Sequence, residues 1–470
     1  MKFITTLLAG LAVAGVANAE YTSPDNGTTF TLQSLSTIEG SGVTVVDNGY
    51  LLSEDLTISA SDKLQIVSGD RLLIADGVMI TLDGEALFNP EETAYITRAT
   101  EDAEPAGFIL GGKATLENMD IQGGGIMYTG SEAFTVDNCN FTNINGVRSG
   151  YGVIVLSGAS VGSKITNSSF KDCVPGAINT PANLGINLLI EGCTIENVSM
   201  ANELRPFINI TSPTEGQLII RNNTLIGNKL EKPGGIGVSN MLNLPGDNKV
   251  LIENNSVKDC SWGLNLIGGM EVRILNNEII DNCWDPDDNG GIAATLYSLP
   301  TYPLDVYAEG NLFQGNKWGP CTIGGTIANF GKTEDPYAED YNPGNNVFVN
   351  NHYTSAAGSL VECDFCNNTA NVDYAQGNVW NYAETLEEAA RTIFGSNYSS
   401  SYGEVIFDPI KTDTGVKVIT DKENVKFNGR VEVYTVDGVK VFDGDSASIS
   451  ELPSGTYIIT SGRVSQKIVK

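Results

Sequence analysis

The stretches LIIRNNTLIGN (218–228), VLIENNSVKDC (250–260) and VRILNNEIIDN (272–282) decide the fold, because they are three copies of one line. In each copy apolar and polar residues alternate, an Asn follows, and another apolar residue stands three positions after that Asn. Similar lines recur between Leu116 and Trp380. A line that returns about every 20 to 40 residues predicts stacked coils rather than a globular core.

Each line turns a corner at its Asn, or at a Gly that replaces it. The predicted corner residues are Asn118, Asn138, Asn167, Gly192, Asn222, Asn254, Asn276, Gly310, Asn350 and Gly377. Asn and Gly tolerate the left-handed backbone that such a corner requires, and stacked Asn amides can hydrogen-bond from coil to coil. The apolar residues two positions before and three positions after each corner are expected to be buried. In the ninth line, whose corner is Asn350, these residues are Phe348 and Tyr353.

The pattern resembles that of the right-handed parallel β-helix family, the pectin-lyase-like proteins, over roughly residues 40 to 410. The resemblance implies an all-β fold, with a β-helix of about ten or more coils spaced by about 4.8 Å, and so a rod on the order of 45 Å long. Residues 55–88 are expected to form short strands of the N-terminal coils. Residues 384–394 are expected to form a capping helix with Leu386, Ala389, Ala390 and Ile393 on one face.

The N-terminus has the features of a secretory signal peptide over residues 1–19. Lys2 precedes a largely apolar run from Phe3 to Val16, and Ala17-Asn18-Ala19 is a small-x-small cleavage site. No other stretch approaches the roughly 20 apolar residues of a membrane span, so we expect no transmembrane segment. The sequence therefore divides into a signal peptide, a β-helix over 20–410 and a different module over 411–470.

The last module has short strands separated by Asp-Gly and Pro-Ser-Gly turns, which predicts a small antiparallel Ig-like β-sandwich. It resembles the C-terminal sorting domain of the type IX secretion system of Bacteroidetes. The residues that carry this resemblance are Val431, Val433, Tyr434, Asp437, Gly438, Leu452, Pro453, Gly455, Tyr457, Lys467, Ile468, Val469 and Lys470. The resemblance implies the type IX secretion machinery as a partner and a secreted or outer-surface location. The alternative is a generic fibronectin-like module.

The charge balance limits the partners. The formal net charge of −30 argues against nucleic acid and anionic lipid, and favours a soluble rod that we expect to be monomeric. The chain has one histidine, His352, which is expected to face solvent. A Ser-His-Asp triad and a His-rich metal site are therefore nearly excluded.

Eight cysteines in an exported chain suggest disulfides, and Cys260 with Cys283 is the predicted pair because they lie on adjacent coils. Cys139 and Cys193 lie two coils apart, too far for a bond. Buried, unpaired cysteines within the repeat are the alternative. Cys363-Asp364-Phe365-Cys366 is a CxxC without a thioredoxin context, for which a local bridge or one to Cys321 is expected.

Chemistry is expected in the insertions of residues 284–345, where the spacing between lines is longest. Trp284, Tyr297, Tyr302, Trp318 and Tyr337 are the candidate ligand-binding residues, because aromatic rings stack on sugar faces. The acidic run Asp285-Pro286-Asp287-Asp288-Asn289-Gly290 begins like a calcium loop, so Asp285, Asp287 and Asn289 are candidate Ca²⁺ ligands. The alternatives are solvated loops and an ordinary acidic turn.

Two functions remain open from sequence. The first is a noncatalytic β-helix that binds or scaffolds at polysaccharide or cell surfaces. The second is a polysaccharide-active enzyme, a glycoside hydrolase or polysaccharide lyase, with its cleft in the insertions of residues 284–345. The motifs of pectate lyases and polygalacturonases are absent from the sequence. This absence favours binding, although two acids could still form a glycosidase pair, and the fold does not decide between the two.

Overall fold

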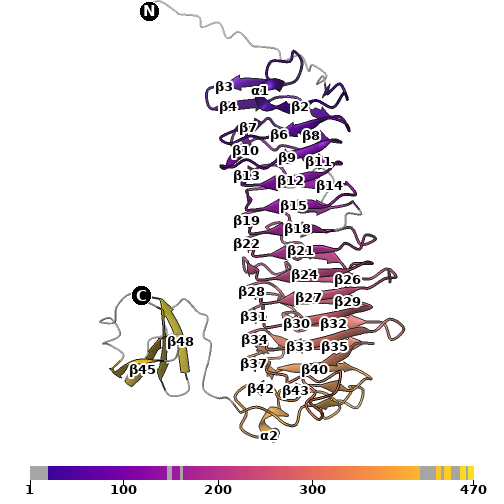
Figure 1. Ribbon diagram of the computed structural model, residues 1–470. Coiled ribbons are helices and arrows are strands. Elements are labelled where there is room, and N and C mark those ends of the chain that lie inside the picture. Colours follow the sequence, from indigo (N-terminus) through magenta and orange to yellow (C-terminus); the bar gives the residue numbers. More distant parts are fainter. Residues whose placement is uncertain are drawn as a thin grey trace, which may run out of the picture.

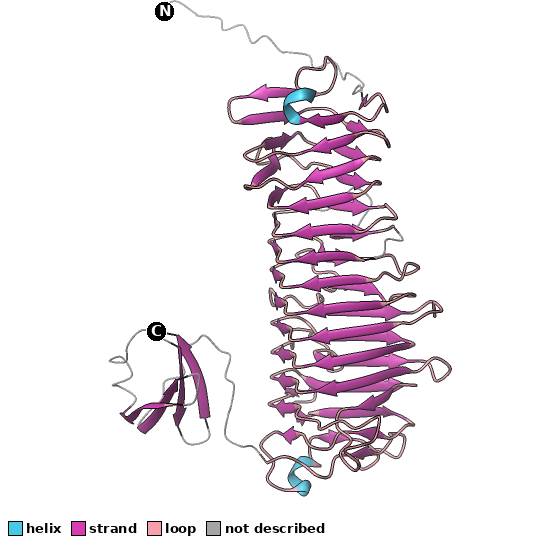
Figure 2. Cartoon of the chain, viewed as in Figure 1, coloured by secondary structure: helices cyan, strands magenta, loops and turns pink. Residues whose placement is uncertain are grey.

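The computed structural model describes residues 20–145, 151–158, 162–412, 430–435, 439–445, 456–461 and 464–469. The predicted signal peptide, and the Asp437-Gly438 and Pro-Ser-Gly turns of the last module, lie outside these residues. Three parallel sheets of 14 strands each run along one rod (Figures 1 and 2). Most coils contribute one strand to each sheet in turn, so that β14, β15 and β16 are followed by β17, which pairs with β14. The exception lies in the first coils, where β3 and β4 form an antiparallel pair within one sheet. The predicted right-handed parallel β-helix is confirmed.

The first sheet carries some of the longest strands of the rod. In sheet order it consists of β1 (Tyr21–Thr22), β5 (Leu56–Ile58), β8 (Met79–Leu82), β11 (Gly107–Leu110), β14 (Ile126–Tyr128), β17 (Gly152–Leu156), β20 (Gly176–Asn179), β23 (Ile208–Thr211), β26 (Ile236–Asn240), β29 (Leu264–Gly268), β32 (Ile292–Ser298), β35 (Trp318–Gly324), β40 (Phe365–Thr369) and β43 (Ile393–Phe394). All its strand pairs are parallel, as the coiled topology requires.

The second sheet contains the alternating apolar residues that precede each predicted corner. Its strands are β2 (Thr29–Thr31), β6 (Lys63–Gln65), β9 (Glu85–Phe88), β12 (Ala114–Glu117), β15 (Phe134–Asp137), β18 (Ser163–Thr166), β21 (Leu188–Glu191), β24 (Gln217–Arg221), β27 (Lys249–Glu253), β30 (Met270–Leu275), β33 (Leu304–Glu309), β36 (Ile327–Asn329), β41 (Asp373–Tyr374) and β44 (Val405–Ile406). In β27, for example, Val250 and Ile252 are buried while their neighbours are not. The predicted period of two is confirmed in this sheet.

The third sheet follows the corner, and most of its strands are only three or four residues long. They are β3 (Val43–Val46), β4 (Gly49–Leu52), β7 (Arg71–Ile74), β10 (Ala94–Arg98), β13 (Met119–Gln122), β16 (Asn140–Thr142), β19 (Ser169–Lys171), β22 (Thr194–Glu196), β25 (Thr224–Ile226), β28 (Ser256–Lys258), β31 (Glu278–Ile280), β34 (Leu312–Gln314), β37 (Val347–Val349) and β42 (Val379–Trp380). A left-handed residue stands at both ends of many of these strands, for example Asn276 (φ 53°) before β31 and Asp281 (φ 54°) after it. The chain thus turns twice per coil, at positions five residues apart.

The ninth predicted line is wrong by five residues. Phe313 pairs in register with Phe348, so Phe348 takes the buried place that the sequence assigned to Tyr353. The residue of the next coil that occupies the corner position of Gly310 is Asn345 (φ 62°). Asn350 (φ 55°) is the second corner of that same coil. Both corners are followed by an Asn, which made the two positions look alike in sequence.

The interior is stabilised by columns of stacked side chains. The Phe313 and Phe348 rings stack at 5.3 Å, and those of Phe348 and Trp380 at 4.4 Å. A polar column runs beside them and consists of Asn223, Asn255, Asn277, Asn311, Asn346 and Asn378. From Asn255 onward, each amide Oδ1 in this column accepts hydrogen bonds from both the backbone N–H and the Nδ2 of the Asn one coil earlier, as in other ladders of identical polar residues. The main amide ladder therefore lies one residue after the predicted corner positions.

The two ends of the rod differ from the prediction in one place. The strands predicted within residues 55–88 are present as β5 to β9, and α1 (Leu32–Leu35) lies among the first coils. The predicted helix over 384–394 is only one turn, α2 (Leu386–Ala389), with Thr385 as its N-cap. Ile393 belongs instead to β43, which pairs with β40. Leu386 is exposed, so the predicted apolar face is not formed as a unit.

The C-terminal module contains a four-stranded antiparallel sheet in the order β46 (Lys440–Asp445), β45 (Arg430–Thr435), β47 (Thr456–Ser461), β48 (Val464–Val469). Val431, Val433 and Ile459 are buried in it. The prediction of a small antiparallel module is confirmed, and the described strands form one sheet. No helix within the described ranges is long and apolar enough to cross a membrane.

Candidate functional site

The aromatic residues predicted to form a cleft in the insertions do not come together. Trp284 is 38% exposed and lies beside Lys229, whose Nζ is 5.2 Å from the centre of the indole ring. Tyr337 is 95% exposed, and Tyr302 is also exposed at a separate turn. Tyr297 lies within β32 of the first sheet. None of these four side chains, and not Trp318 either, lines any of the three cavities described below.

Trp318 has a structural environment. Its ring centre lies 5.5 Å from that of Tyr353 and 5.9 Å from that of Phe394, the latter in an edge-on contact. Its Nε1 donates a 2.8 Å hydrogen bond to the carbonyl oxygen of Asp288. Both its face and its polar atom are used within the protein, so Trp318 is a packing residue.

The predicted Ca²⁺ loop is an acidic turn. The Asp285 Oδ1 accepts a 2.9 Å hydrogen bond from the backbone N–H of Asp287, and the Asp288 carboxylate accepts the N–H of Ala356. The Asn289 side chain is exposed. No group of three or more His, Cys, Asp or Glu side chains in the described ranges is placed to hold a metal ion. Asp285, Asp287 and Asn289 lie in the same turn, and their role as Ca²⁺ ligands stays a prediction.

Cys260 and Cys283, the predicted disulfide pair, have free thiols in the structure, as do the other six cysteines. Cys260 occupies a second ladder of the interior, where its backbone N–H donates to Asn282 Oδ1 at 3.1 Å. Asn282, not Cys283, takes the matching place in the next coil, and Asn316 and Asn351 continue the column. The alternative of buried ladder cysteines holds for Cys260.

A groove does exist, but at another part of the rod. It follows the corner between the third and the first sheet, where the chain leaves β10, β13, β16, β19 and β22 in five successive coils. A cavity of about 500 Å³ and a second of about 210 Å³ share Asn145 and Val174 in their walls, so they adjoin. At about 4.8 Å per coil, four coil steps give this groove a length of about 19 Å. We call it the corner groove.

The larger cavity of the corner groove is organised by Arg98, at the end of β10. Its Nη2 donates to the carbonyl oxygen of Asn143, two coils away, and its Nη1 donates a 3.5 Å hydrogen bond to that of Glu101. Its Nε is buried and has no hydrogen-bond partner among the described residues. Asn145 closes the wall and donates through Nδ2 to Glu104 Oε1 at 2.9 Å. Arg98 is thus fixed by the hydrogen bonds of its Nη1 and Nη2, while its Nε–H donor has no partner among the described residues.

The smaller cavity combines an aromatic ring with a second leftover polar group. The Arg205 guanidinium stacks 3.7 Å from the centre of the Tyr151 ring, which is 61% exposed. Ser199 is 3% exposed, has a left-handed backbone (φ 56°) and lines the cavity. Its Oγ has no hydrogen-bond partner within the described ranges. Leaving such a group buried and unpaired costs about 1–3 kcal/mol.

The acidic side chains of the corner groove are engaged or exposed. Asp172 Oδ1 accepts a 2.6 Å hydrogen bond from Asn197 Nδ2, and Glu203 Oε2 lies 3.1 Å from Arg205 Nε. Glu101 is exposed. The two carboxyl groups whose pKa is raised most by burial are Asp373, to about 8, and Asp364, to about 6, and neither lines the groove. The groove therefore presents hydrogen-bonding groups and one ring rather than an activated acid.

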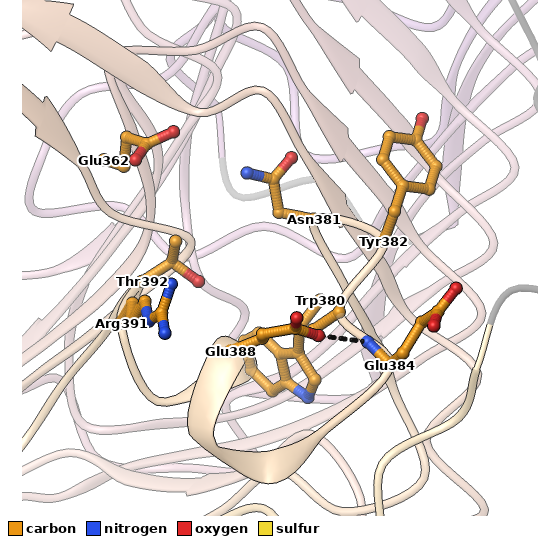
Figure 3. A pocket seen from close by; sticks show the side chains of 9 residues that line it. Glu362, Trp380, Asn381, Tyr382, Glu384, Glu388, Arg391 and Thr392 are labelled. Atoms are coloured by element: carbon orange, nitrogen blue, oxygen red, sulfur yellow. Dashed lines mark hydrogen bonds between the residues drawn. The ribbon is translucent and has the colours of Figure 1, made fainter.

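A further cavity of about 400 Å³ lies at the C-terminal end of the rod, between Trp380 and α2 (Figure 3). Its best-ordered carboxylate, Glu388, accepts hydrogen bonds from the backbone N–H groups of Glu384 (2.8 Å) and Thr385 (3.2 Å), which is a capping box. We assign this cavity to the end cap. His352 is exposed on β38 (His352–Thr354), which pairs with β39 (Leu360–Glu362), so its predicted exposure is confirmed.

Sequence reasoning missed Arg98, Tyr151, Ser199 and Arg205. These residues belong to loops that differ in length and composition from coil to coil, and so they share no motif. One signal was present, because the loops that follow Phe141 and Ile195 are both long and leave the same corner. The spacing between successive repeats is longest at residues 284–345, and for this reason the sequence placed the site there.

One family model agrees with the fold of the central coils. Residues 108–279 match the family model described as the right-handed beta helix region. A crystal structure of a double mutant of the periplasmic alginate epimerase AlgG is 10% identical over 82% of each chain, with a TM-score of 0.46. Another structure of the same epimerase is 9% identical over 82% of this chain and 81% of that chain, with a TM-score of 0.29. No curated protein matches the sequence. The matched region identifies the central coils as right-handed β-helix.

Proposed function

We propose that this protein is a noncatalytic, glycan-binding β-helix that works outside the cell and holds a stretch of polysaccharide in the corner groove. The observation that carries the proposal is the pair of leftover polar atoms, Arg98 Nε and Ser199 Oγ, in two adjoining cavities. The hydroxyl groups of a polysaccharide can accept a hydrogen bond from Arg98 Nε, and they can either donate to Ser199 Oγ or accept from it.

The surroundings of these atoms fit a sugar chain better than a compact small molecule. The groove is open and about 19 Å long by the coil spacing, so it can follow several units of a linear polymer. Amide groups of Asn143 and Asn145 line it, and Tyr151 offers an exposed aromatic ring in the smaller cavity. Rings that contact sugar faces beside convergent polar groups are typical of carbohydrate sites.

Binding without cleavage is favoured over the enzymatic alternative because of the state of the acids. A glycosidase needs two carboxyl groups that face the same bond, one of them held as an acid. In the corner groove Asp172 and Glu203 are already bound to Asn197 and Arg205. The strongly perturbed carboxyl groups, Asp364 and Asp373, are buried in the C-terminal coils away from this groove.

The test is retardation of the full chain in gels that contain plant, algal or host polysaccharides, together with an assay for new reducing ends and unsaturated products. We expect retardation by at least one polymer and no products. Tyr151→Ala should reduce retardation, as should Ser199→Ala. Tyr302→Ala is the matched control, because Tyr302 is also an exposed tyrosine but lies in the insertions. If Tyr302→Ala abolishes binding and Tyr151→Ala does not, the site is in the insertions; if products accumulate, the protein is an enzyme.

Export by the type IX secretion machinery is a second part of the proposal. It is supported by the resemblance of the sequence 431–470 to sorting domains and by the antiparallel sheet that these residues form. In a Bacteroidetes host that has this system, deletion of residues 411–470 should leave the protein in the periplasm, while the full chain reaches the medium or the cell surface. Equal export of both forms would contradict this part without affecting the binding proposal.

A further inference from the structure

Three cysteines that are distant in sequence meet near the C-terminal end of the rod. Cys321 in β35 and Cys366 in β40 are direct register partners on adjacent parallel strands. Cys363 stands just before β40, three residues from Cys366. All three are buried, with exposures of 8%, 4% and 0% for Cys321, Cys366 and Cys363. Phe394 belongs to the same cluster, and Trp318 and Tyr402 cover it.

The other buried cysteines have a different environment. Cys139, Cys173, Cys193 and Cys260 each direct the thiol to backbone carbonyl oxygens, for example Cys139 Sγ to Asp137 O at 3.3 Å and Cys173 Sγ to Lys171 O at 3.2 Å. Burial raises the pKa of Cys139 to about 12 and that of Cys193 to about 11, which makes both thiols unreactive. They serve the interior packing of the repeat.

In the cluster, by contrast, thiols are neighbours of thiols. The neighbouring Cys321 and Cys363 thiols lower the pKa of Cys366 below its ordinary value, and Cys363 Sγ itself donates a 3.5 Å hydrogen bond to the carbonyl oxygen of Phe365. The same contacts and burial raise the pKa of Cys321 and Cys363. Cys366 is therefore the most readily ionised thiol of the three, and a thiolate is the attacking species in disulfide chemistry.

From this geometry we infer that Cys321, Cys363 and Cys366 form a disulfide site in which Cys366 is shared between two alternative bonds. One bond, to Cys321, joins adjacent coils. The other, to Cys363, closes the short Cys363–Cys366 segment. Facing residues on neighbouring strands lie at Cα separations within the range that disulfides accept. Because the folded cluster is buried, the bond forms while the last coils assemble in an oxidising environment.

The chemistry balances with a small disulfide such as oxidised glutathione as the oxidant. The Cys366 thiolate attacks one sulfur of the oxidant, forms a mixed disulfide and expels one glutathione thiolate, which takes up the proton that Cys366 lost. Cys321 or Cys363 then loses its proton and attacks Cys366 Sγ, which expels the second glutathione. Two protein thiols become one disulfide, and one glutathione disulfide becomes two thiols. The third cysteine can later attack that bond and move it without net oxidation.

The test is refolding of the full chain in oxidised and reduced glutathione, followed by alkylation in denaturant, digestion and mass spectrometry. We expect two of the eight thiols to be lost, in peptides that join Cys366 to Cys321 or to Cys363. Cys321→Ser and Cys363→Ser should each leave one bond, at the remaining partner. Cys366→Ser should keep all its thiols free, whereas the control Cys193→Ser should lose two, like the wild type.

Two results would overturn the inference. One is a wild-type protein that keeps eight thiols after oxidative refolding and shows native circular dichroism, a result that depends on no variant. The other is a Cys366→Ser variant that loses two thiols through a Cys321–Cys363 bond, which would remove the shared role of Cys366. The glycan-binding proposal is unaffected by either result, since its residues lie elsewhere on the rod.

Discussion

The amide ladder is predicted to carry much of the local stability of the central coils, and Asn277→Ala tests this. Asn277 Nδ2 donates to Ile252 O at 2.9 Å and to Asn311 Oδ1 at 3.0 Å. Its Oδ1 accepts from the backbone N–H of Asn255 at 2.9 Å and from Asn255 Nδ2 at 3.0 Å. The substitution removes all four bonds inside a buried environment. At about 1 kcal/mol for each hydrogen bond, the expected loss is about 4 kcal/mol.

The assay is amide hydrogen exchange, followed by mass spectrometry of peptides that contain Asn255. A rod of stacked coils opens locally, so exchange reports the affected coils better than a global melting curve does. A loss of about 4 kcal/mol corresponds to exchange on the order of a thousandfold faster, because each 1.4 kcal/mol is a factor of ten. Peptides from the first coils, such as those around Leu64, should exchange as in the wild type.

Asn276→Gly is the matched control, since it changes the neighbouring residue of the same corner. Asn276 has a φ of 53°, and Gly192 (66°) and Gly310 (70°) already occupy the equivalent position in other coils. Gly adopts this backbone without strain, so the expected change is below about 1 kcal/mol. The reasoning is refuted if Asn277→Ala accelerates exchange no more than Asn276→Gly does.

Three further predictions concern stability. Burial raises the pKa of Asp373 from its ordinary 3.8 to about 8, so the folded state binds this proton more tightly than the unfolded state. The contribution of Asp373 to stability should be full below about pH 4 and fall by up to about 6 kcal/mol as the pH rises through 8. Melting temperatures at pH 4.5 and 8.5 should therefore differ less in Asp373→Asn than in the wild type, and equal differences would contradict the assignment. Gly227→Ala places a Cβ 1.9 Å from Asp259 O and should cost about 1–3 kcal/mol in thermal unfolding, whereas Gly111→Ala, with its nearest contact at 3.4 Å, should be almost neutral. Trp318→Ala should reduce the free energy of unfolding by about 3 kcal/mol through lost packing, and so lower the melting temperature, while leaving polysaccharide retardation unchanged. Reduced retardation in a folded variant would return Trp318 to the binding site.

The sequence predicted the fold because a coil repeats the same physical requirements. Val250 and Ile252 are buried on alternate positions, and the corner at Asn254 needs a left-handed backbone, which few residue types adopt easily. The same logic explains the error at Asn350. Each coil has two left-handed corners five residues apart, and Asn345-Asn346 and Asn350-Asn351 satisfy both with the same dipeptide. Only the pairing of Phe313 with Phe348 separates the two possibilities.

The site could not be predicted in the same way, because its parts meet only through stacking. Arg98 reaches the carbonyl oxygen of Asn143, and Arg205 lies on Tyr151, although many residues separate the members of each pair. Which loop residues face one another depends on loop lengths in successive coils, and a one-residue change moves a side chain to another face. The predicted aromatic residues failed for a related reason: Trp318 entered a strand and became part of the packing.

The position of the unpaired polar groups connects scaffold and function. In the interior, repetition satisfies polar groups well: Asn255, Asn277 and Asn311 hydrogen-bond to one another from coil to coil, so their column leaves no reason to expect a ligand. Ser199 departs from this pattern, because it is buried at a left-handed position with an Oγ that has no partner in the described structure. A cost of about 1–3 kcal/mol is small beside the stability of a long ladder, so the rod can retain such a residue. Because a ligand in the adjoining cavity would remove that cost, Ser199→Ala should weaken glycan binding while leaving the free protein as stable as the wild type or more stable. A variant that binds normally but is more stable would show that Ser199 is a packing defect and not part of a site.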